Sequence, residues 1–240
     1  IILKSFPCGA HALRRRFRRF FRFMRFIDLV RARQSCRDYG NRPVGRDDLT
    51  TILEAGRLSP SACNIQPWRF VVADRGPIVA EVAQCLQGMG MNRFTANVPA
   101  FIVLCEQTAN LKETIASGIG GHNYAQLDIG IAAAHMVLCA RTLGIDSCII
   151  GWFSDKKLRR TLNLPVGQKV RLVIALGYGK NEPVRPKRRR AFDDVVRFMP
   201  ENGPADARPT ITPPAPQERR APQASDLPRT QPNFSELDGD

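Results

Sequence analysis

The sequence predicts an α+β fold in which helices cover a mostly central sheet, formed by one domain over residues 24–200. Segments with apolar residues at helical spacing outnumber segments that look like strands. The strand-like segments are continuous apolar runs, typical of strands that are buried on both faces. No Asn-Gly or Asp-Gly dipeptide joins these runs as a hairpin turn, so helices and longer loops are expected to connect them.

The predicted helices follow from spacing and from boundary residues. A helix ending before Ser59-Pro60 can be capped by Asp47 or Asp48. The segment 124–143 is apolar nearly all round, with small residues in its middle, which is typical of a buried helix that another helix approaches closely. The predicted helices cover residues 26–34, 49–57, 77–86, 124–143 and 155–162.

Three segments are predicted as buried strands. They are WRFVVA at residues 68–73, PAFIVLC at residues 99–105 and KVRLVIAL at residues 169–176. Each is a short apolar run of strand length, and β-branched residues are frequent in all three.

The net charge of +14 is unevenly distributed along the chain. Residues 1–26 carry +8, residues 27–200 carry +9 and residues 201–240 carry −3. A charge equal to more than half of the net value therefore lies in the short N-terminal arm, which weakens the case for nucleic-acid binding by the domain itself.

The two ends of the chain are predicted to lie outside the fold. Residues 1–23 alternate arginine and phenylalanine without helical spacing or turn residues, and Met24 opens a predicted helix. They are either a basic arm that could meet a nucleic acid or an anionic membrane, or sequence ahead of the true start. Residues 201–240 are proline-rich with few large apolar residues, and are predicted to be disordered.

Cysteine usage favours a reducing compartment. The seven cysteines form no CxxC pair and their number is odd, which argues against a disulfide framework or a zinc ribbon. No stretch offers about 18 consecutive apolar residues for a membrane span. The expected location is the cytoplasm.

A first polar cluster lies at the end of the first predicted helix, in the sequence RARQSCRDY at residues 31–39. Three arginines and a serine within seven residues suit a phosphorylated ligand, because guanidinium forks match phosphate oxygens two at a time. A solvated basic helix end is the alternative for this cluster taken alone.

A second cluster is the loop SPSACNIQPW at residues 59–68. Two prolines restrict the loop, and Asn64 and Gln66 present amide donors and acceptors that could bind the edge of a planar heteroaromatic ring. An ordinary helix-to-strand connection is the alternative. A third cluster, Lys187 to Arg190, is a second candidate phosphate group or an exposed basic run.

The sequence contains no motif whose residues could carry out catalysis without a cofactor. There is no P-loop, no GxSxG, no HExxH and no set of Cys, His and carboxylate residues at metal-ligand spacing. Anion-binding clusters without a nucleophile, an acid–base pair or a metal site indicate that the chemistry comes from a bound cofactor.

Taken in order, these segments resemble the nitroreductase family over residues 24–199. Residues 33–37 (RQSCR) are similar to the family's flavin-phosphate motif, and SPSACNIQPWRF is similar to its second motif. Residues 97–100 (NVPA), the helix at 128–143, residues 143–153 (LGIDSCIIGWF), and residues 175–178 (ALGY) with Lys187 and Arg189 match its later landmarks.

The resemblance implies a homodimer with a mixed or antiparallel sheet flanked by helices, and FMN held at the two-fold interface. The phosphate and ribityl chain would be held by Arg33, Ser35, Lys187 and Arg189, and Arg37 would lie near the pyrimidine edge of the ring. Gln34, within the same motif, is also expected to belong to the cofactor site. Pro60, Ser61, Asn64 and Gln66 would come from the partner subunit, and the backbone of Ile150 and Gly151 would face the ring. No side chain is assigned as a catalytic acid or base, and no metal is expected.

Two departures from the family pattern stand out. Gln34 occupies the place of a second arginine, which puts part of the phosphate affinity in doubt. The stretch between Cys105 and His122 is short, which indicates a compact member with an open pocket.

The function implied is reduction of a nitroaromatic, quinone or similar small-molecule acceptor by NADH or NADPH, in a ping-pong cycle through FMN. One alternative keeps the fold and changes the flavin reaction to dehalogenation or azoline oxidation. Another is a basic nucleic-acid or membrane-surface binder acting through residues 1–26.

Overall fold

The structure is a computed structural model that describes residues 25–107, 124–180 and 183–199. The chain divides into two units, the first ending at Lys187 and the second beginning at Arg188. Residues 1–23, 201–240 and the short stretch that follows Cys105 carry predictions that fall mostly or wholly outside the described residues. Within the described residues, no helix combines the length and the apolar character that crossing a membrane requires.

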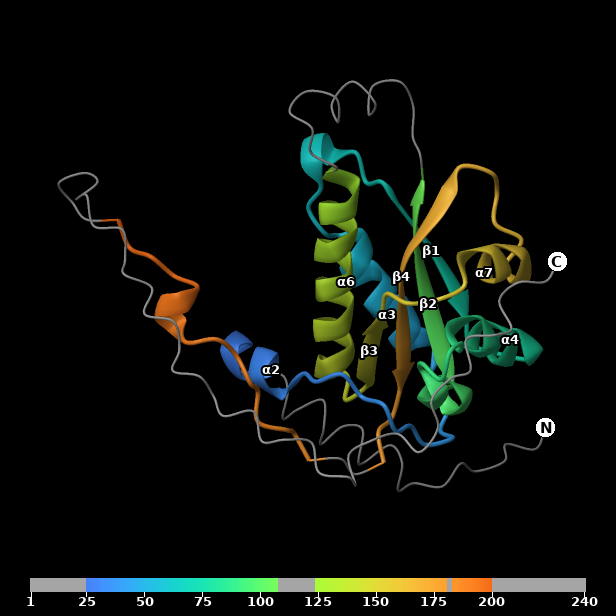
Figure 1. Ribbon diagram of the computed structural model, residues 1–240, viewed down its shortest axis with the longest axis horizontal. Helices are drawn as coiled ribbons and strands as arrows, with labels where there is room; N and C mark the ends of the chain where they lie inside the picture. Colours follow the sequence, from blue (N-terminus) through green and yellow to red (C-terminus); the bar gives the residue numbers. More distant parts are fainter. Residues whose placement is uncertain (1–24, 108–123, 181–182, 200–240) are drawn as a thin grey trace, which may run out of the picture. The chain divides into compact units, whose positions relative to one another are not determined.

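The centre of the first unit is a four-stranded sheet in the order β1-β2-β4-β3 (Figure 1). Its strands are β1 (Trp68–Ala73), β2 (Ala100–Gln107), β3 (Asp146–Ile150) and β4 (Gln168–Gly177). All three strand pairs are antiparallel. β2 and β4 lie in the middle, and this explains why their sequences are continuous apolar runs.

Helices cover both faces of this sheet, and alternation along the strands separates the two cores. On one face, Ile102, Leu104 and Ile174 pack with residues of α3 (Arg46–Arg57) and α6 (Tyr124–Thr142). On the other face, Phe101, Val103 and Val173 pack with residues of α4 (Pro77–Leu86) and α7 (Asp155–Thr161). Figure 1 shows α6 and α3 together and α4 and α7 together.

The remaining described elements are short. They are α2 (Phe26–Ala32), η1 (Ala62–Asn64) and η2 (Arg93–Asn97) in the first unit, and η3 (Phe192–Asp194) in the second.

The predicted α+β class is confirmed, and the differences in detail have physical causes. Segment 146–150 was not predicted as a strand, because it is a short run whose strand character depends on pairing with β4. α3 begins at Arg46 with Gly45 as its N-cap, so Asp47 and Asp48 lie in the first turn instead of capping it. Of the two alternatives expected for the sheet, mixed or antiparallel, the four described strands form the antiparallel one.

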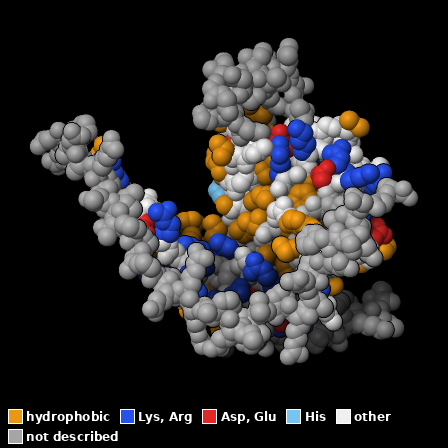
Figure 2. All heavy atoms as spheres, in the orientation of Figure 1, with side chains coloured by type: hydrophobic (Ala, Val, Ile, Leu, Met, Phe, Trp, Pro, Cys, Tyr) orange, Lys and Arg blue, Asp and Glu red, His pale blue; other side chains and the backbone are white. Residues whose placement is uncertain are grey.

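Among the described residues, none covers one side of α6. Leu127 and Ile131 are 60% and 38% exposed, and a side chain added at Gly130 would meet nothing within 4 Å. Ala134 and His135 are exposed on the same helix. Figure 2 shows hydrophobic side chains at the surface over this helix. The prediction of a helix buried on every face is therefore met only in part by the contacts of a single chain.

Candidate functional site

The first part of the site is the segment that leaves α2. The helix ends at Ala32, and Arg33 takes an extended conformation with φ −69° and ψ 127°. The chain then runs along β3, where the N–H of Cys36 donates to the carbonyl of Ser147 at 3.0 Å and Ser35 pairs with Ser147 in a parallel bridge. Since side chains alternate along an extended segment, Arg33, Ser35 and Arg37 share one side of it.

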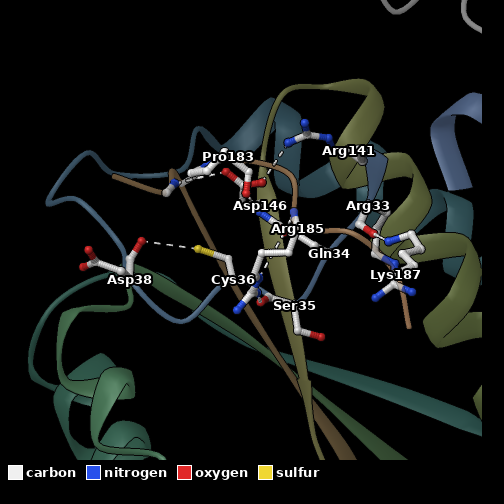
Figure 3. A network of polar contacts seen from close by, with 11 residues as sticks. Arg33, Gln34, Ser35, Cys36, Asp38, Arg141, Asp146, Pro183, Arg185 and Lys187 are labelled. Carbon is white, nitrogen blue, oxygen red and sulfur yellow. Dashed lines mark hydrogen bonds and ion pairs between the residues drawn. The ribbon is translucent and has the colours of Figure 1, made fainter. Parts of the chain in front are cut away.

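A distant segment, residues 183–187, meets this one (Figure 3). The Nζ of Lys187 donates to the carbonyl of Arg33, across 154 positions of sequence. The side-chain amide of Gln34 donates to the carbonyl of Pro183 at 3.3 Å. The structure thus brings together four of the expected cofactor-binding residues, Arg33, Gln34, Ser35 and Lys187. It adds Arg185, which was not predicted.

Basic side chains converge on the middle of β3. Burial raises the pKa of the Cys148 thiol, and the positive charges of Arg37, Arg185 and Arg33 oppose that rise. A buried thiol influenced by three guanidinium groups marks a positive field in this part of the first unit. Arg37 is exposed, so its cation can meet a ligand.

An ion pair holds the start of β3. The guanidinium of Arg141, near the end of α6, bonds the carboxylate of Asp146 at 2.8 Å, and the N–H of Gly179 donates to the same carboxylate at 3.1 Å. This links α6, β3 and the chain after β4, and so positions the edge against which residues 33–37 lie.

The second part of the site is the loop between α3 and β1. Cys63, Asn64 and Gln66 have φ values of 50°, 54° and 55° in the left-handed region, which costs non-glycine residues roughly 1–2 kcal/mol each. Such a conformation persists only where neighbouring contacts determine it. Pro60, Asn64 and Gln66 are exposed, and Ser61 is half-buried.

Hydrogen bonds within the loop help to hold these residues in the left-handed conformation. The hydroxyl of Ser61 accepts from the backbone N–H of Gln66 at 3.0 Å. The side-chain amide of Gln66 donates to the carbonyl and side-chain oxygens of Asn64, both at 3.1 Å. The sequence predicted rigidity from the two prolines, and these bonds add a reason that the sequence did not reveal.

Two side chains of α6 anchor the loop. Both carboxylate oxygens of Asp128 accept from the N–H of Ala62, at 3.2 Å each. The hydroxyl of Ser59 lies 2.8 Å from Nδ1 of His135. Sequence reasoning missed Asp128 as part of the site, because an acidic residue in a predicted helix carries no signal of a contact 66 positions away.

Ile150 is the last residue of β3, and Gly151 follows it. Ile150 is buried in the core, whereas Gly151 is exposed, and a side chain added at Gly151 would meet nothing within 4 Å. The absence of a side chain leaves the backbone accessible at this point, which suits a planar ring lying against it.

Arg189 belongs to the second unit, where its guanidinium donates to the carbonyl of Arg188 at 2.7 Å. Its predicted role with Lys187 stays a prediction. Among the described residues, no group of three His, Cys, Asp or Glu side chains is placed to hold a metal ion.

The basic cluster and the loop are anchored at different points of α6. Asp128 holds the loop and Arg141 holds the start of β3, 13 positions further along, which is roughly 20 Å of helix at 1.5 Å per residue. A single chain therefore presents two separated groups of candidate site residues.

The fold and these residues define an α+β protein that carries a basic cluster beside β3 and a hydrogen-bonded polar loop before β1. The family model for the nitroreductase family matches residues 30–89 and 79–178 of this chain. The chain belongs to the nitroreductase family.

Known proteins agree with this assignment. A protein of Archaeoglobus fulgidus, provisionally named NADH dehydrogenase/NAD(P)H nitroreductase, is 29% identical over 160 residues, covering 65% of this chain and 86% of its own. An FMN-dependent nitroreductase from Clostridium difficile R20291 superposes with a TM-score of 0.60 at 28% identity, covering 72% of this chain and 98% of its own. A nitroreductase family protein from Streptococcus pneumoniae TIGR4 has the same fold, with a TM-score of 0.63, 24% identity, and coverage of 73% and 100%.

Proposed function

We propose that this chain is an FMN-dependent oxidoreductase that uses NADH or NADPH to reduce a nitroaromatic, quinone or similar acceptor. The observation that carries the proposal is the convergence of residues 33–37 and 183–187, which places basic side chains and Ser35 together on a preformed edge within a nitroreductase fold. The name of the Clostridium difficile neighbour includes FMN, and the name of the Archaeoglobus relative includes NAD(P)H.

The chemistry of the donors suits FMN. Its phosphate is a dianion that charged donors and a hydroxyl would bind, and Arg33, Ser35 and Lys187 provide them. Gln34, in contrast, has its amide engaged with residues 183–185, so its contribution to the cofactor site is positional. The open backbone at Gly151 would receive the ring.

When bound, FMN supplies the group that takes up a hydride and passes it on. The protein itself would bind FMN and the substrates and orient them. The Arg37 cation would stabilise negative charge at the ring edge, and the N–H groups after Ile150 would face the ring. In the overall reaction, NAD(P)H and one proton convert a quinone into its hydroquinone, so no side chain has to remain altered at the end of the cycle.

A homodimer completes this site. The exposed Leu127, Gly130 and Ile131 give α6 an apolar surface with room for close helix contact. A partner subunit on that surface would bring Pro60, Ser61, Asn64 and Gln66 of its loop to the basic cluster of the other chain. The loop is already held in its conformation by Asp128, so little ordering would be needed on binding.

The test is a visible absorption spectrum of the purified full chain after incubation with FMN and gel filtration. The expected result is a bound-flavin spectrum that bleaches when NADH or NADPH is added without oxygen and returns when a quinone or nitroaromatic is added. A protein that retains no FMN overturns the proposal. Bound flavin that neither pyridine nucleotide bleaches would contradict the assigned reductant.

A further inference from the structure

Arg185 reaches the 33–37 segment from a position 150 residues later in the chain (Figure 3). Its Nη2 donates to the carbonyl of Ser35 at 2.6 Å, and its Nε donates to the side-chain oxygen of Gln34 at 3.3 Å. The side chain as a whole remains exposed. A guanidinium that is held by such bonds and still in contact with solvent is suited to meet an anion.

Gln34 is the residue that fixes this arrangement. Its oxygen accepts from both the backbone N–H of Arg185, at 3.0 Å, and the side chain of Arg185. Its amide nitrogen donates to the carbonyl of Pro183. A side chain that both accepts and donates is required here, and an arginine at position 34 could not accept either bond. Gln34 therefore adds no charge of its own, but it positions the charge of Arg185.

Arg185 lies beside the residues that are proposed to bind the phosphate. The Nζ of Lys187, two positions on, bonds the carbonyl of Arg33. Arg185 and Lys187 therefore both bond the backbone of the short segment that carries Arg33 and Ser35. Their charges would act together on a phosphate dianion placed beside Ser35.

We propose that Arg185, positioned by Gln34, binds the terminal phosphate monoester of the flavin nucleotide and so selects FMN over riboflavin. This inference rests on the proposed function. It assigns Arg185 to ligand binding and Gln34 to positioning. It also accounts for a glutamine at a place where the family resemblance leads one to expect arginine, because the charge is delivered from residue 185 instead.

The test compares the affinities of FMN and riboflavin, which differ only in the phosphate. Flavin is removed from the full-length protein, and each ligand is titrated while flavin fluorescence is followed. Arg185→Ala is expected to weaken FMN binding roughly ten- to a hundredfold, the scale of a charged hydrogen bond, and to leave riboflavin binding within about twofold. Arg185→Lys should restore part of the lost FMN affinity, because it keeps the charge and loses the fork.

Three further variants separate binding from folding. Arg185→Gln removes the charge and keeps a donor toward the Ser35 carbonyl, so it should lose FMN affinity as Arg185→Ala does. Gln34→Ala should weaken FMN binding by itself, and it should add little when Arg185 is already alanine, because both changes act through one interaction. Arg160→Ala removes an exposed positive charge from α7 and should leave both affinities unchanged.

Unchanged FMN affinity in both Arg185→Ala and Arg185→Gln overturns the inference, and so does an equal loss for FMN and riboflavin. In either case the wild-type chain still binds FMN, and the proposed function stands. If the wild-type chain binds neither flavin, both proposals fall together.

Discussion

Asp128 and the backbone of Ala62 are joined by two hydrogen bonds of 3.2 Å, one to each carboxylate oxygen. Asp128 is buried on α6, and Ala62 begins the turn that leads into the left-handed residues Cys63 and Asn64. The helix that carries the exposed Leu127 and Ile131 thus also holds the loop that is proposed to reach the flavin of the partner subunit. This link between α6 and the loop makes loop geometry, stability and cofactor affinity interdependent.

Replacement of Asp128 by alanine is expected to lower the free energy of unfolding by about 1–3 kcal/mol, because the Ala62 N–H loses its acceptor. FMN affinity should fall with it, since the strained loop loses an anchor. Asp128→Asn keeps an oxygen that can accept, so it is the matched control. Thermal unfolding and FMN titration measure the two effects. Equal behaviour of the alanine and asparagine variants would show that the bond contributes nothing.

The pKa of Asp128 predicts that the stability of the fold depends on pH. Burial raises the pKa of Asp128, and the Ala62 hydrogen bond opposes the rise. The folded protein then retains this proton at pH values where the unfolded chain has lost it, so ionisation lowers stability as the pH rises through that window. The variant Asp128→Asn should match the wild type near pH 3 and gain relative stability from about pH 4 upward. A relative gain at low pH instead would contradict this sign.

Substitution by alanine is expected to have different effects at two glycines, Gly177 and Gly151. A side chain at Gly177 would lie 2.7 Å from Pro99 and 2.8 Å from the ring of Tyr39, and neither neighbour is flexible. Gly177→Ala is therefore expected to cost roughly 1–3 kcal/mol of stability, measured by denaturant unfolding.

Gly151→Ala enters open space, so the stability of the free protein should change by less than about 0.5 kcal/mol. Its FMN affinity should fall nonetheless, because the new methyl group would occupy the surface proposed for the ring. A Gly151→Ala protein that binds FMN as tightly as the wild type would remove Gly151 from the site.

The exposed side of α6 yields a prediction about assembly. Ile131→Glu places a carboxylate in the proposed interface and should weaken the dimer roughly a hundredfold or more, with loss of bound FMN. Light scattering after gel filtration measures the mass. Val166→Glu, at a fully exposed position before β4, is the control and should remain dimeric. A monomeric wild type that still binds FMN would contradict the shared site.

The sequence was sufficient for most elements of the fold because their signals are local. The helical spacing of residues 77–86 and the apolar run of residues 68–73 correspond to α4 and β1 without change of bounds. Segment 146–150 lacked such a signal, since five residues become a strand only through their pairing with β4. The start of α3 was misplaced because Gly45 acts as the cap where an aspartate was expected.

The sequence by itself determined the chemistry available to the site: arginines and a serine for a phosphate, and amides in a proline-bounded loop. The tertiary structure alone decided that Arg185 joins the cluster through Gln34, that Asp128 holds the loop, that the backbone at Gly151 is exposed, and that Leu127 and Ile131 of α6 stay exposed. These contacts join positions 66 to 151 residues apart. Composition and spacing describe neighbours along the chain, whereas such contacts form only when both faces of the sheet have been packed.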